Sequence, residues 1–336
     1  MPLIAATLLA VGGWIVPWQH DAGLAAVERA RGGLGDVFLF AARLDADGHP
    51  VLDGSAEAWA GTIRRVHDRG ARAWLTVVND LVSAGTSATL KDADIVHRLI
   101  ADADARAAHS REIVALAKSL SVDGLDLDYE NLPASERDAF TAFVGRLAAD
   151  LHASELSLSV TVQPKRRETS SKGPGAADWR RICAVADRMQ VMLYNQHNAA
   201  TGAGPIADLD WIGGIVDYGL DTCPASKLVP VVKVSGMDWG PAKAEWRSFA
   251  EVSSTRAALR PRLRREHVSR VPWFSYHGDD GRHVVYFEDA ASLGAKAERL
   301  RARGLSTIVL WSLGSEDPEA IPRLVQTFRP AAGQKR

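Results

Sequence analysis

The sequence has few of the features that mark metal proteins, nucleic-acid-binding proteins or membrane proteins. It has only two cysteines, Cys183 and Cys223, too few for a disulfide framework and not spaced like zinc ligands, so we expect two buried thiols. Its 40 Lys+Arg and 41 Asp+Glu leave a formal net charge of −1, which gives no long-range attraction for nucleic acid or an anionic membrane. No apolar stretch reaches the roughly 20 residues that a membrane-spanning helix needs. A neutral partner fits this composition better.

The sequence also lacks a complete leader and any cofactor signature. Residues 1–10 are apolar, but no Lys or Arg precedes the apolar run, so we expect either the remnant of a signal peptide or a lead-in to the first strand. No Gly-rich phosphate loop follows the first predicted strand, and the ten histidines show no metal-ligand spacing. We therefore expect neither a cofactor nor a metal.

Short apolar, β-branched or aromatic runs alternate along the chain with amphipathic runs, the pattern of βα repeats. Some of these runs are hydrophobic throughout, as in Leu228-Val229-Pro230-Val231-Val232, which suits parallel strands buried on both faces. The predicted strands cover residues 12–18, 37–43, 73–78, 124–129, 156–163, 190–195, 228–234 and 306–311.

The predicted helices cover residues 22–31, 56–69, 93–120, 135–152, 177–186, 209–218, 290–303 and 321–328. Gly32, Gly70 and Gly304 each follow a helical run, where glycine takes the left-handed geometry of a helix stop. Eight such units predict one (β/α)8 TIM barrel over residues 11–328, with residues 329–336 as a tail. A doubly wound open sheet is the structural alternative.

One interval interrupts the repeat. Residues 236–289 separate the seventh predicted strand from the next helix, a connection far longer than the usual βα loop. We expect a small α+β insertion there, containing Trp239, Trp246, Trp273 and Tyr276. Because βα loops lie at the carboxyl ends of barrel strands, this insertion would form one wall of a site.

The most informative segment is Asp123-Gly124-Leu125-Asp126-Leu127-Asp128-Tyr129-Glu130. Side chains alternate along a strand, so Asp126, Asp128 and Glu130 would project from one face, into the barrel. Neighbouring buried carboxylates raise one another's pKa, which is how an acid keeps its proton near neutral pH. Magnesium or calcium binding is the competing interpretation, because acidic triads also bind these ions. No further acidic cluster ends another predicted strand, which favours catalysis.

This segment resembles the D-x-x-D-x-D-x-E signature of glycoside hydrolase family 18, the chitinase and N-acetylglucosaminidase family, with all four acidic positions present. Met192-Leu193-Tyr194-Asn195 is similar to the family's M-x-Y-D segment on strand six, and Trp311 to its strand-eight tryptophan. Residues 286–290 and 310–317 resemble the subgroup that contains spore-cortex-lytic glucosaminidases.

The resemblance implies roles for individual residues. Glu130 would be the general acid/base, Asp128 would orient the substrate's 2-acetamido group, and Asp126 would share a proton with Asp128. The attacking oxygen would come from that acetamido group rather than from the protein.

Further positions of the site follow from the same resemblance. Tyr194 would donate a hydrogen bond to the acetamido group, and Trp311 would form the floor under the sugar ring. Met192 and Asn195 would line the site. Asn195 stands where most of the family has Asp, although some plant-type members also have Asn. Because a neutral amide replaces a carboxylate, we expect the change to affect the pH dependence of activity.

Position alone adds further substrate-binding candidates. Trp14 ends the first predicted strand, Gln163 ends the fifth, and Trp239 lies in the insertion. Lys165 and Lys233 also lie near strand ends, where pairing with a buried acid competes with substrate contact. Asp123 is expected to stabilise the turn before its strand rather than to take part in catalysis.

The sequence therefore predicts a glycosidase that cleaves β-linked glycans containing N-acetylglucosamine, with peptidoglycan and chitin-like chains as candidates. The alternative is a weakly active or inactive carbohydrate-binding protein of the same fold. Binding-only relatives typically lose the catalytic glutamate, and Glu130 is present, which favours the enzyme. We expect a monomer that is secreted or located in the cell envelope. The sequence leaves open which glycan is cut and whether cleavage is endo or exo.

Overall fold

The computed structural model describes residues 11–81 and 89–328. The sequence-based expectations for residues 1–10 and 329–336 lie outside this part of the chain. Among the described residues, parallel pairing of eight strands closes into a barrel, because β1 pairs with both β14 and β2. The barrel strands are β1 (Val11–Ile15), β2 (Asp36–Leu44), β4 (Arg72–Leu81), β5 (Gly124–Asp128), β6 (Ser157–Val162), β7 (Arg188–Met192), β8 (Leu228–Lys233) and β14 (Ile308–Trp311).

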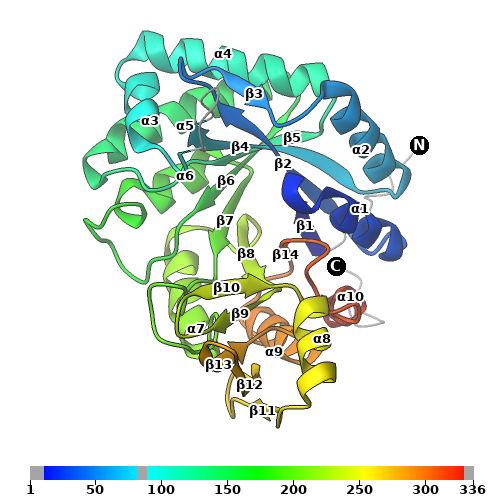
Figure 1. Cartoon of the computed structure of the whole chain (residues 1–336). Coiled ribbons are helices and arrows are strands. Elements are labelled where there is room, and N and C mark those ends of the chain that lie inside the picture. Colours follow the sequence, from blue (N-terminus) through cyan, green and yellow to red (C-terminus); the bar gives the residue numbers. More distant parts are fainter. Residues whose placement is uncertain (1–10, 82–88, 329–336) are drawn as a thin grey trace.

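Helices surround this barrel, as Figure 1 shows. They are α1 (His20–Arg29), α2 (Ala56–Asp68), α3 (Ala93–Ile100), α4 (Ala103–Leu120), α5 (Arg137–His152), α6 (Trp179–Val185), α7 (Leu209–Thr222), α9 (Ala290–Arg301) and α10 (Ala320–Phe328). The predicted (β/α)8 TIM barrel is confirmed. A short strand, β3 (Pro50–Leu52), adds to the outer side of β2 in antiparallel orientation.

One predicted helix is divided in two. The run expected over residues 93–120 forms α3 and α4, because Asp102 ends the first and caps the second. Its carboxylate accepts hydrogen bonds from the backbone N–H groups of Asp104 and Ala105, which have no partner within the helix itself. The periodicity of apolar residues continues across this break, which is why the sequence indicated one helix.

Two hydrophobic layers hold the barrel together. Between the strands and the helices, alternate strand residues such as Leu125 and Leu127 join a large buried cluster. Inside the barrel a second cluster contains Trp14, Phe38 and Trp74. These bulky rings fill much of the barrel interior.

The amino-terminal end of the barrel is closed by ion pairs around Asp36 on β2. Its carboxylate accepts hydrogen bonds from Arg72 and Trp74 on the neighbouring β4 and from Arg188 on β7, on the opposite side of the barrel, at 2.7–2.9 Å. Both guanidinium groups also lie over the Trp74 ring, 5.2 and 5.0 Å from its centroid. This end is therefore packed for stability and leaves the carboxyl ends of the strands for a functional site.

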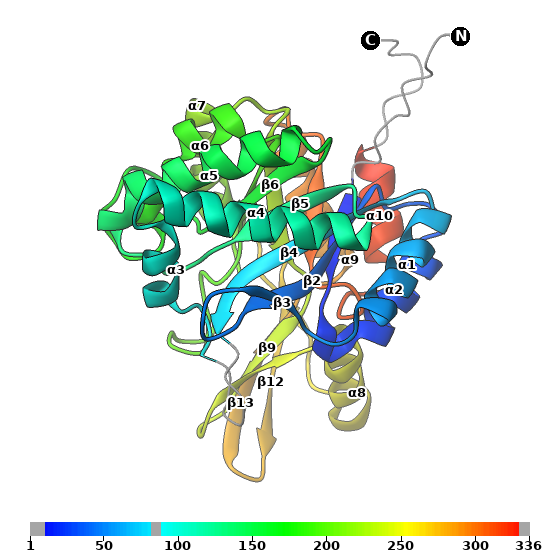
Figure 2. The same ribbon diagram turned by 90° about the horizontal axis from the view of Figure 1, so that it is seen from above.

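Residues 236–289 form a second sheet with its own helix between β8 and α9. Five antiparallel strands follow the order β10-β9-β13-β12-β11. Their apolar core consists of Val252, Phe274, Val285 and Phe287. Figure 2 shows the insertion projecting from the barrel, in yellow to orange. Its elements are β9 (Gly236–Trp239), β10 (Ala244–Arg247), α8 (Phe249–Leu259), β11 (Arg264–Arg265), β12 (Pro272–Gly278) and β13 (Gly281–Tyr286).

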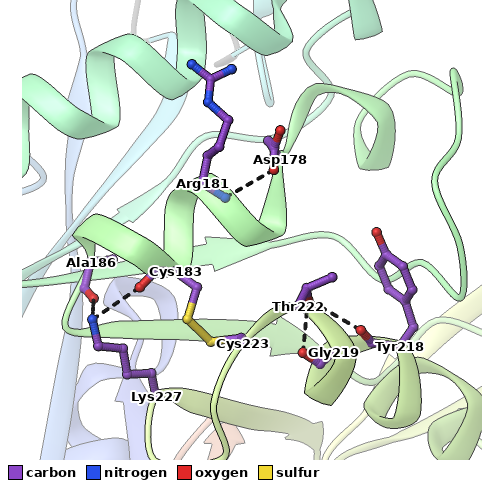
Figure 3. Close-up of a disulfide and its surroundings, with 9 residues drawn as sticks. All are labelled: Asp178, Arg181, Cys183, Ala186, Tyr218, Gly219, Thr222, Cys223 and Lys227. Atoms are coloured by element: carbon purple, nitrogen blue, oxygen red, sulfur yellow. Dashed lines mark hydrogen bonds between the residues drawn. A yellow bond between two sulfur atoms is a disulfide. The ribbon is translucent and has the colours of Figure 1, made fainter.

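The expectation of two free thiols is wrong, because Cys183 and Cys223 form a disulfide. Cys183 lies in α6 and Cys223 caps the carboxyl end of α7, and the fold brings their Cα atoms to 5.7 Å. Figure 3 shows the bond beside Lys227, whose ammonium donates to the carbonyl oxygens of Cys183 and Ala186. The bond ties two neighbouring barrel helices together on the outside of the sheet.

The disulfide should stabilise the fold, because it closes a loop between residues 40 positions apart and so restricts the unfolded chain. A reductant is expected to lower the free energy of unfolding by about 2–4 kcal/mol, measured by urea titration. The double variant Cys183→Ser/Cys223→Ser serves as the control and should not respond to reductant. An unchanged urea midpoint for the reduced wild type would contradict the prediction.

Candidate active site

Strand β5 carries the acidic residues into the barrel, as its alternating sequence predicted. Asp126 and Asp128 are buried, while Glu130 follows the end of the strand with 18% of its side chain exposed. Gly124 at the start of β5 is required by packing, since a Cβ atom there would lie 2.4 Å from the Trp74 ring. The acidic row thus runs from the buried interior to the carboxyl end of the barrel.

Asp126 is held by polar side chains from the neighbouring strands. Thr161 on β6 donates to its carboxylate at 3.0 Å, and Gln190 on β7 at 3.0 Å. Thr76 on β4 donates a longer bond at 3.3 Å and receives one from the Trp14 indole. Burial raises the pKa of Asp126 to about 6, although these hydrogen bonds act in the opposite direction.

Asp128 and Glu130 share a cation that the sequence analysis missed. The ammonium of Lys91 lies 3.0 Å from Glu130 Oε1 and 3.3 Å from Asp128 Oδ2. Burial raises the pKa of Asp128, and Lys91 works against this shift. Burial alone would lower the pKa of Lys91, but the carboxylates of Asp128, Glu130 and Asp80 outweigh it and raise that pKa.

The other oxygen of Asp128, Oδ1, is buried without a hydrogen-bond partner among the described residues. Buried carboxylate oxygens are normally paired, so this atom is an acceptor available to a ligand. The only sequence signal for Lys91 was a positive charge after the third predicted strand. Nothing in that position indicated which carboxylates it would meet.

The backbone of Glu130 is fixed by a single side chain from the next strand. Asn79 on β4 accepts a hydrogen bond from the Glu130 N–H at 2.9 Å and donates one to its carbonyl oxygen at 3.0 Å. Gln163 was expected to bind substrate. Its side-chain oxygen accepts a hydrogen bond from the N–H of Asn131, the residue after Glu130, at 3.1 Å. Both amides act as positioning residues, because they hold the segment from which the Glu130 side chain projects.

Tyr194 enters the same site from the segment that follows β7. It is buried, and burial together with the carboxylates of Glu130, Asp128 and Asp126 raises its pKa well above the usual value. The phenol therefore stays protonated and can donate a hydrogen bond. Met192 is buried beside it in the interior cluster. Asn195 is exposed and takes a left-handed backbone conformation with φ of 68°, which asparagine tolerates better than most residues.

Aromatic side chains cover the side of the mouth formed by β14 and β1. Trp311 is half-buried and meets Phe40 edge to face, with ring centroids 5.3 Å apart. Trp14 is almost fully buried against Trp311, which argues for a supporting role rather than the sugar contact expected. The exposed Trp18 also approaches Trp311, at 6.4 Å. Trp239 is half-buried at the edge of the insertion, and its indole donates to the Asn198 carbonyl oxygen.

Two residues near strand ends have structural roles. Asp123 accepts a hydrogen bond from the Ala73 N–H at 2.7 Å, at the amino-terminal end of β5, where it joins β5 to β4. Lys165 donates to the Ala177 carbonyl oxygen at 2.6 Å and pairs with Glu168. Both contacts lie within the protein and agree with the alternative of structural pairing.

Within residues 11–81 and 89–328, no three His, Cys, Asp or Glu side chains are grouped to hold a metal ion. No helix in that part of the chain is long and apolar enough to cross a membrane.

The chain is similar to known proteins in sequence and in fold. In Bacillus subtilis (strain 168), the putative sporulation-specific glycosylase YdhD is 28% identical over 71% of this chain and 57% of its own length. The cortical fragment-lytic enzyme of the same organism is 27% identical over 62% of this chain and 50% of its own. The aligned regions thus span little more than half of these curated relatives.

Among solved structures, a chitinase from Chromobacterium violaceum ATCC 12472 aligns with a TM-score of 0.85 at 26% identity, covering 96% of this chain and 99% of its own. The Bacillus cereus spore cortex-lytic enzyme SleL aligns equally well by TM-score, 0.85, at 20% identity, over 96% of this chain and 74% of its own.

The family model for glycosyl hydrolases family 18 matches residues 91–317. This segment begins at Lys91, contains the acidic row and Tyr194, and continues past Trp311. The chain belongs to glycosyl hydrolases family 18.

Proposed function

We propose that this protein is a glycoside hydrolase that cleaves β-linked glycans containing N-acetylglucosamine, of the peptidoglycan or chitin type, by substrate-assisted retaining catalysis. The observation that carries the proposal is the placement of Glu130. It is the partly exposed end of a buried acidic row, and the Asn79 side chain holds both its backbone N–H and its carbonyl oxygen. Family membership and the names of the relatives, which include chitinases and cortex-lytic enzymes, support the same class of reaction.

In the proposed first step, the acetamido oxygen of the substrate attacks its own anomeric carbon. The bond from that carbon to the glycosidic oxygen breaks, and the departing oxygen takes the proton of Glu130. The free Oδ1 of Asp128 would accept the acetamido N–H, and the protonated Tyr194 hydroxyl would donate to the acetamido oxygen.

In the second step, water attacks the anomeric carbon of the oxazolinium intermediate and gives a proton back to Glu130. The bond from that carbon to the acetamido oxygen breaks, which restores the acetamido group. Asp126 sits below Asp128 with a pKa raised to about 6 by burial, so a proton retained near this pair limits the negative charge in the barrel. The half-buried ring of Trp311 offers a flat apolar surface to the sugar face.

One observation favours the second candidate function, a weakly active glycan-binding protein. The ammonium of Lys91 contacts Glu130 Oε1 at 3.0 Å, where the glycosidic oxygen would have to approach. This ion pair would have to be broken before the substrate could reach the Glu130 carboxyl group. The test for this candidate is therefore the behaviour of Lys91 variants.

Glu130→Gln should abolish turnover while leaving the fold intact, because the amide keeps the shape of the side chain and loses its proton. We expect kcat on N-acetylglucosamine oligomers to fall by about 100-fold or more, with an unchanged thermal midpoint. Glu319→Gln makes the same chemical change at an exposed position and should retain full activity. Wild-type turnover by Glu130→Gln would refute the assignment.

Lys91→Met should move the alkaline limb of kcat/KM upward in pH. Lys91 lowers the pKa of Asp128, so removing the lysine lets Asp128 keep its proton to higher pH. Lys118→Met, on the exposed side of α4, is the matched control and should leave the profile in place. If the alkaline limb of kcat/KM is unchanged or moves to lower pH in Lys91→Met, this electrostatic role is wrong.

The acetamido group should be required for the reaction. A deacetylated oligomer is expected to bind but to react at a small fraction of the normal rate, because the nucleophile is missing. Two inversions at the same carbon restore the starting configuration, so NMR should show the β anomer as the first product. An initial α anomer would mean direct attack by water, and the roles of Asp128 and Tyr194 would then be withdrawn.

A further inference from the structure

A second lysine at the mouth of the barrel has no part in the mechanism above. On β8, the side chains of Val229 and Val231 join the interior cluster, so the alternation of the strand also directs Lys233 inward. Lys233 is the last residue of β8, and its register partner on β14 is Trp311. It therefore lies at the carboxyl end of the barrel, beside the proposed sugar-binding surface.

Aromatic rings from two other elements meet the Lys233 ammonium. Trp246, on β10 of the insertion, lies with its ring centroid 3.0 Å from Nζ, and the Tyr194 ring lies at 5.8 Å. Lys233 is only 8% exposed, whereas Trp246 is 39% exposed. Lys233 thus lies between Tyr194 in the proposed catalytic site and the partly exposed ring of Trp246 on the insertion.

Comparison with the other buried lysines shows what is unusual about Lys233. Lys296 forms an ion pair with Glu288, and Lys165 binds the Ala177 carbonyl oxygen and Glu168. Among the described residues, Lys233 has neither a carboxylate nor another oxygen within hydrogen-bond distance of its ammonium. The Lys233 ammonium therefore faces aromatic rings, and no oxygen of the described residues accepts a hydrogen bond from it.

Such an arrangement is unfavourable unless a ligand completes it, because a buried charge normally requires a hydrogen-bonded partner. Burial lowers the pKa of Lys233 to about 7, so the protonated and neutral forms are both populated near neutral pH. An arriving anion would shift this balance toward the ammonium and accept its hydrogen bonds. A neutral sugar hydroxyl would gain much less from the same position.

We propose that Lys233 and Trp246 form a subsite for a carboxylate carried by a sugar unit of the glycan, next to the unit that lies on Trp311. The ring of Trp246 would pack against that sugar while the ammonium of Lys233 binds its carboxylate. The inference rests on the proposed function and narrows it, since chitin-like chains are neutral. It selects glycans in which N-acetylglucosamine alternates with an acidic amino sugar.

A carboxylate of this kind has two sources in peptidoglycan. It is borne by the lactyl ether of the muramic unit when no peptide is attached, or by the peptide stem when the lactyl group is amidated. We assign the subsite to the sugar-borne group, because Lys233 lies within the barrel mouth, between Tyr194 and Trp311, rather than on the outer surface of the insertion.

Calorimetric titration of the Glu130→Gln protein tests the subsite without turnover. The ligands are glycan fragments with free lactyl carboxylates, the same fragments after conversion of the carboxylates to neutral amides, and peptide-bearing fragments. The free acid should bind about tenfold or more tightly than the amide, as expected for hydrogen bonds to a charged group. Adding Lys233→Met should reduce this preference to about threefold or less.

Lys165→Met in the same background is the matched control, because it removes a buried lysine that already has oxygen partners, and the preference should persist. Equal affinity for acid and amide, or a preference that survives Lys233→Met, overturns the subsite. A Lys233-dependent preference confined to peptide-bearing fragments overturns the sugar-borne assignment. Failure of the wild type to cleave any of these glycans or N-acetylglucosamine oligomers would reject the proposed function instead, while the binding result would still decide the subsite.

Discussion

The burial of negative charge at the end of β5 is the constraint on which the rest of the site depends. Asp126 and Asp128 lie on the inward face of β5, almost inaccessible to solvent, and Glu130 follows shortly after the strand. The surrounding elements offset the unfavourable burial of these carboxylates by different means. Hydroxyl and amide donors surround Asp126, a lysine faces Asp128 and Glu130, and an asparagine fixes the Glu130 backbone. The interior of the barrel is thus specified around one acidic row.

Much of this could be predicted from the sequence because it depends on local periodicity. Apolar runs placed all eight barrel strands, and the alternation from Asp126 to Glu130 fixed which face is acidic. The contacts of Lys91 and Asn79 with Asp128 and Glu130 could not be predicted, since they join residues more than 35 positions apart whose approach depends on strand register. The disulfide was missed for the same reason, because only the packing of α6 against α7 brings Cys183 near Cys223.

Two lysines at the same mouth show how far neighbours determine the chemistry of a side chain. Lys91 faces three carboxylates, and its pKa is raised despite burial. Lys233 faces aromatic rings, and burial lowers its pKa to about 7. Both are lysines, so the residue type alone could not have separated the two cases in the sequence. The difference lies in which side chains the adjoining elements supply.

The insertion leaves and rejoins the barrel at nearly the same place, because Met237 near its start pairs with Tyr286 near its end. Its apolar core of Val252, Phe274, Val285 and Phe287 is separate from the two clusters of the barrel. A segment with adjacent ends and its own core can vary without changing the strand order of the barrel, while Met237 at its base packs into the interior cluster. Changes in the insertion could therefore alter which glycans are recognised while the catalytic residues of the barrel are unchanged.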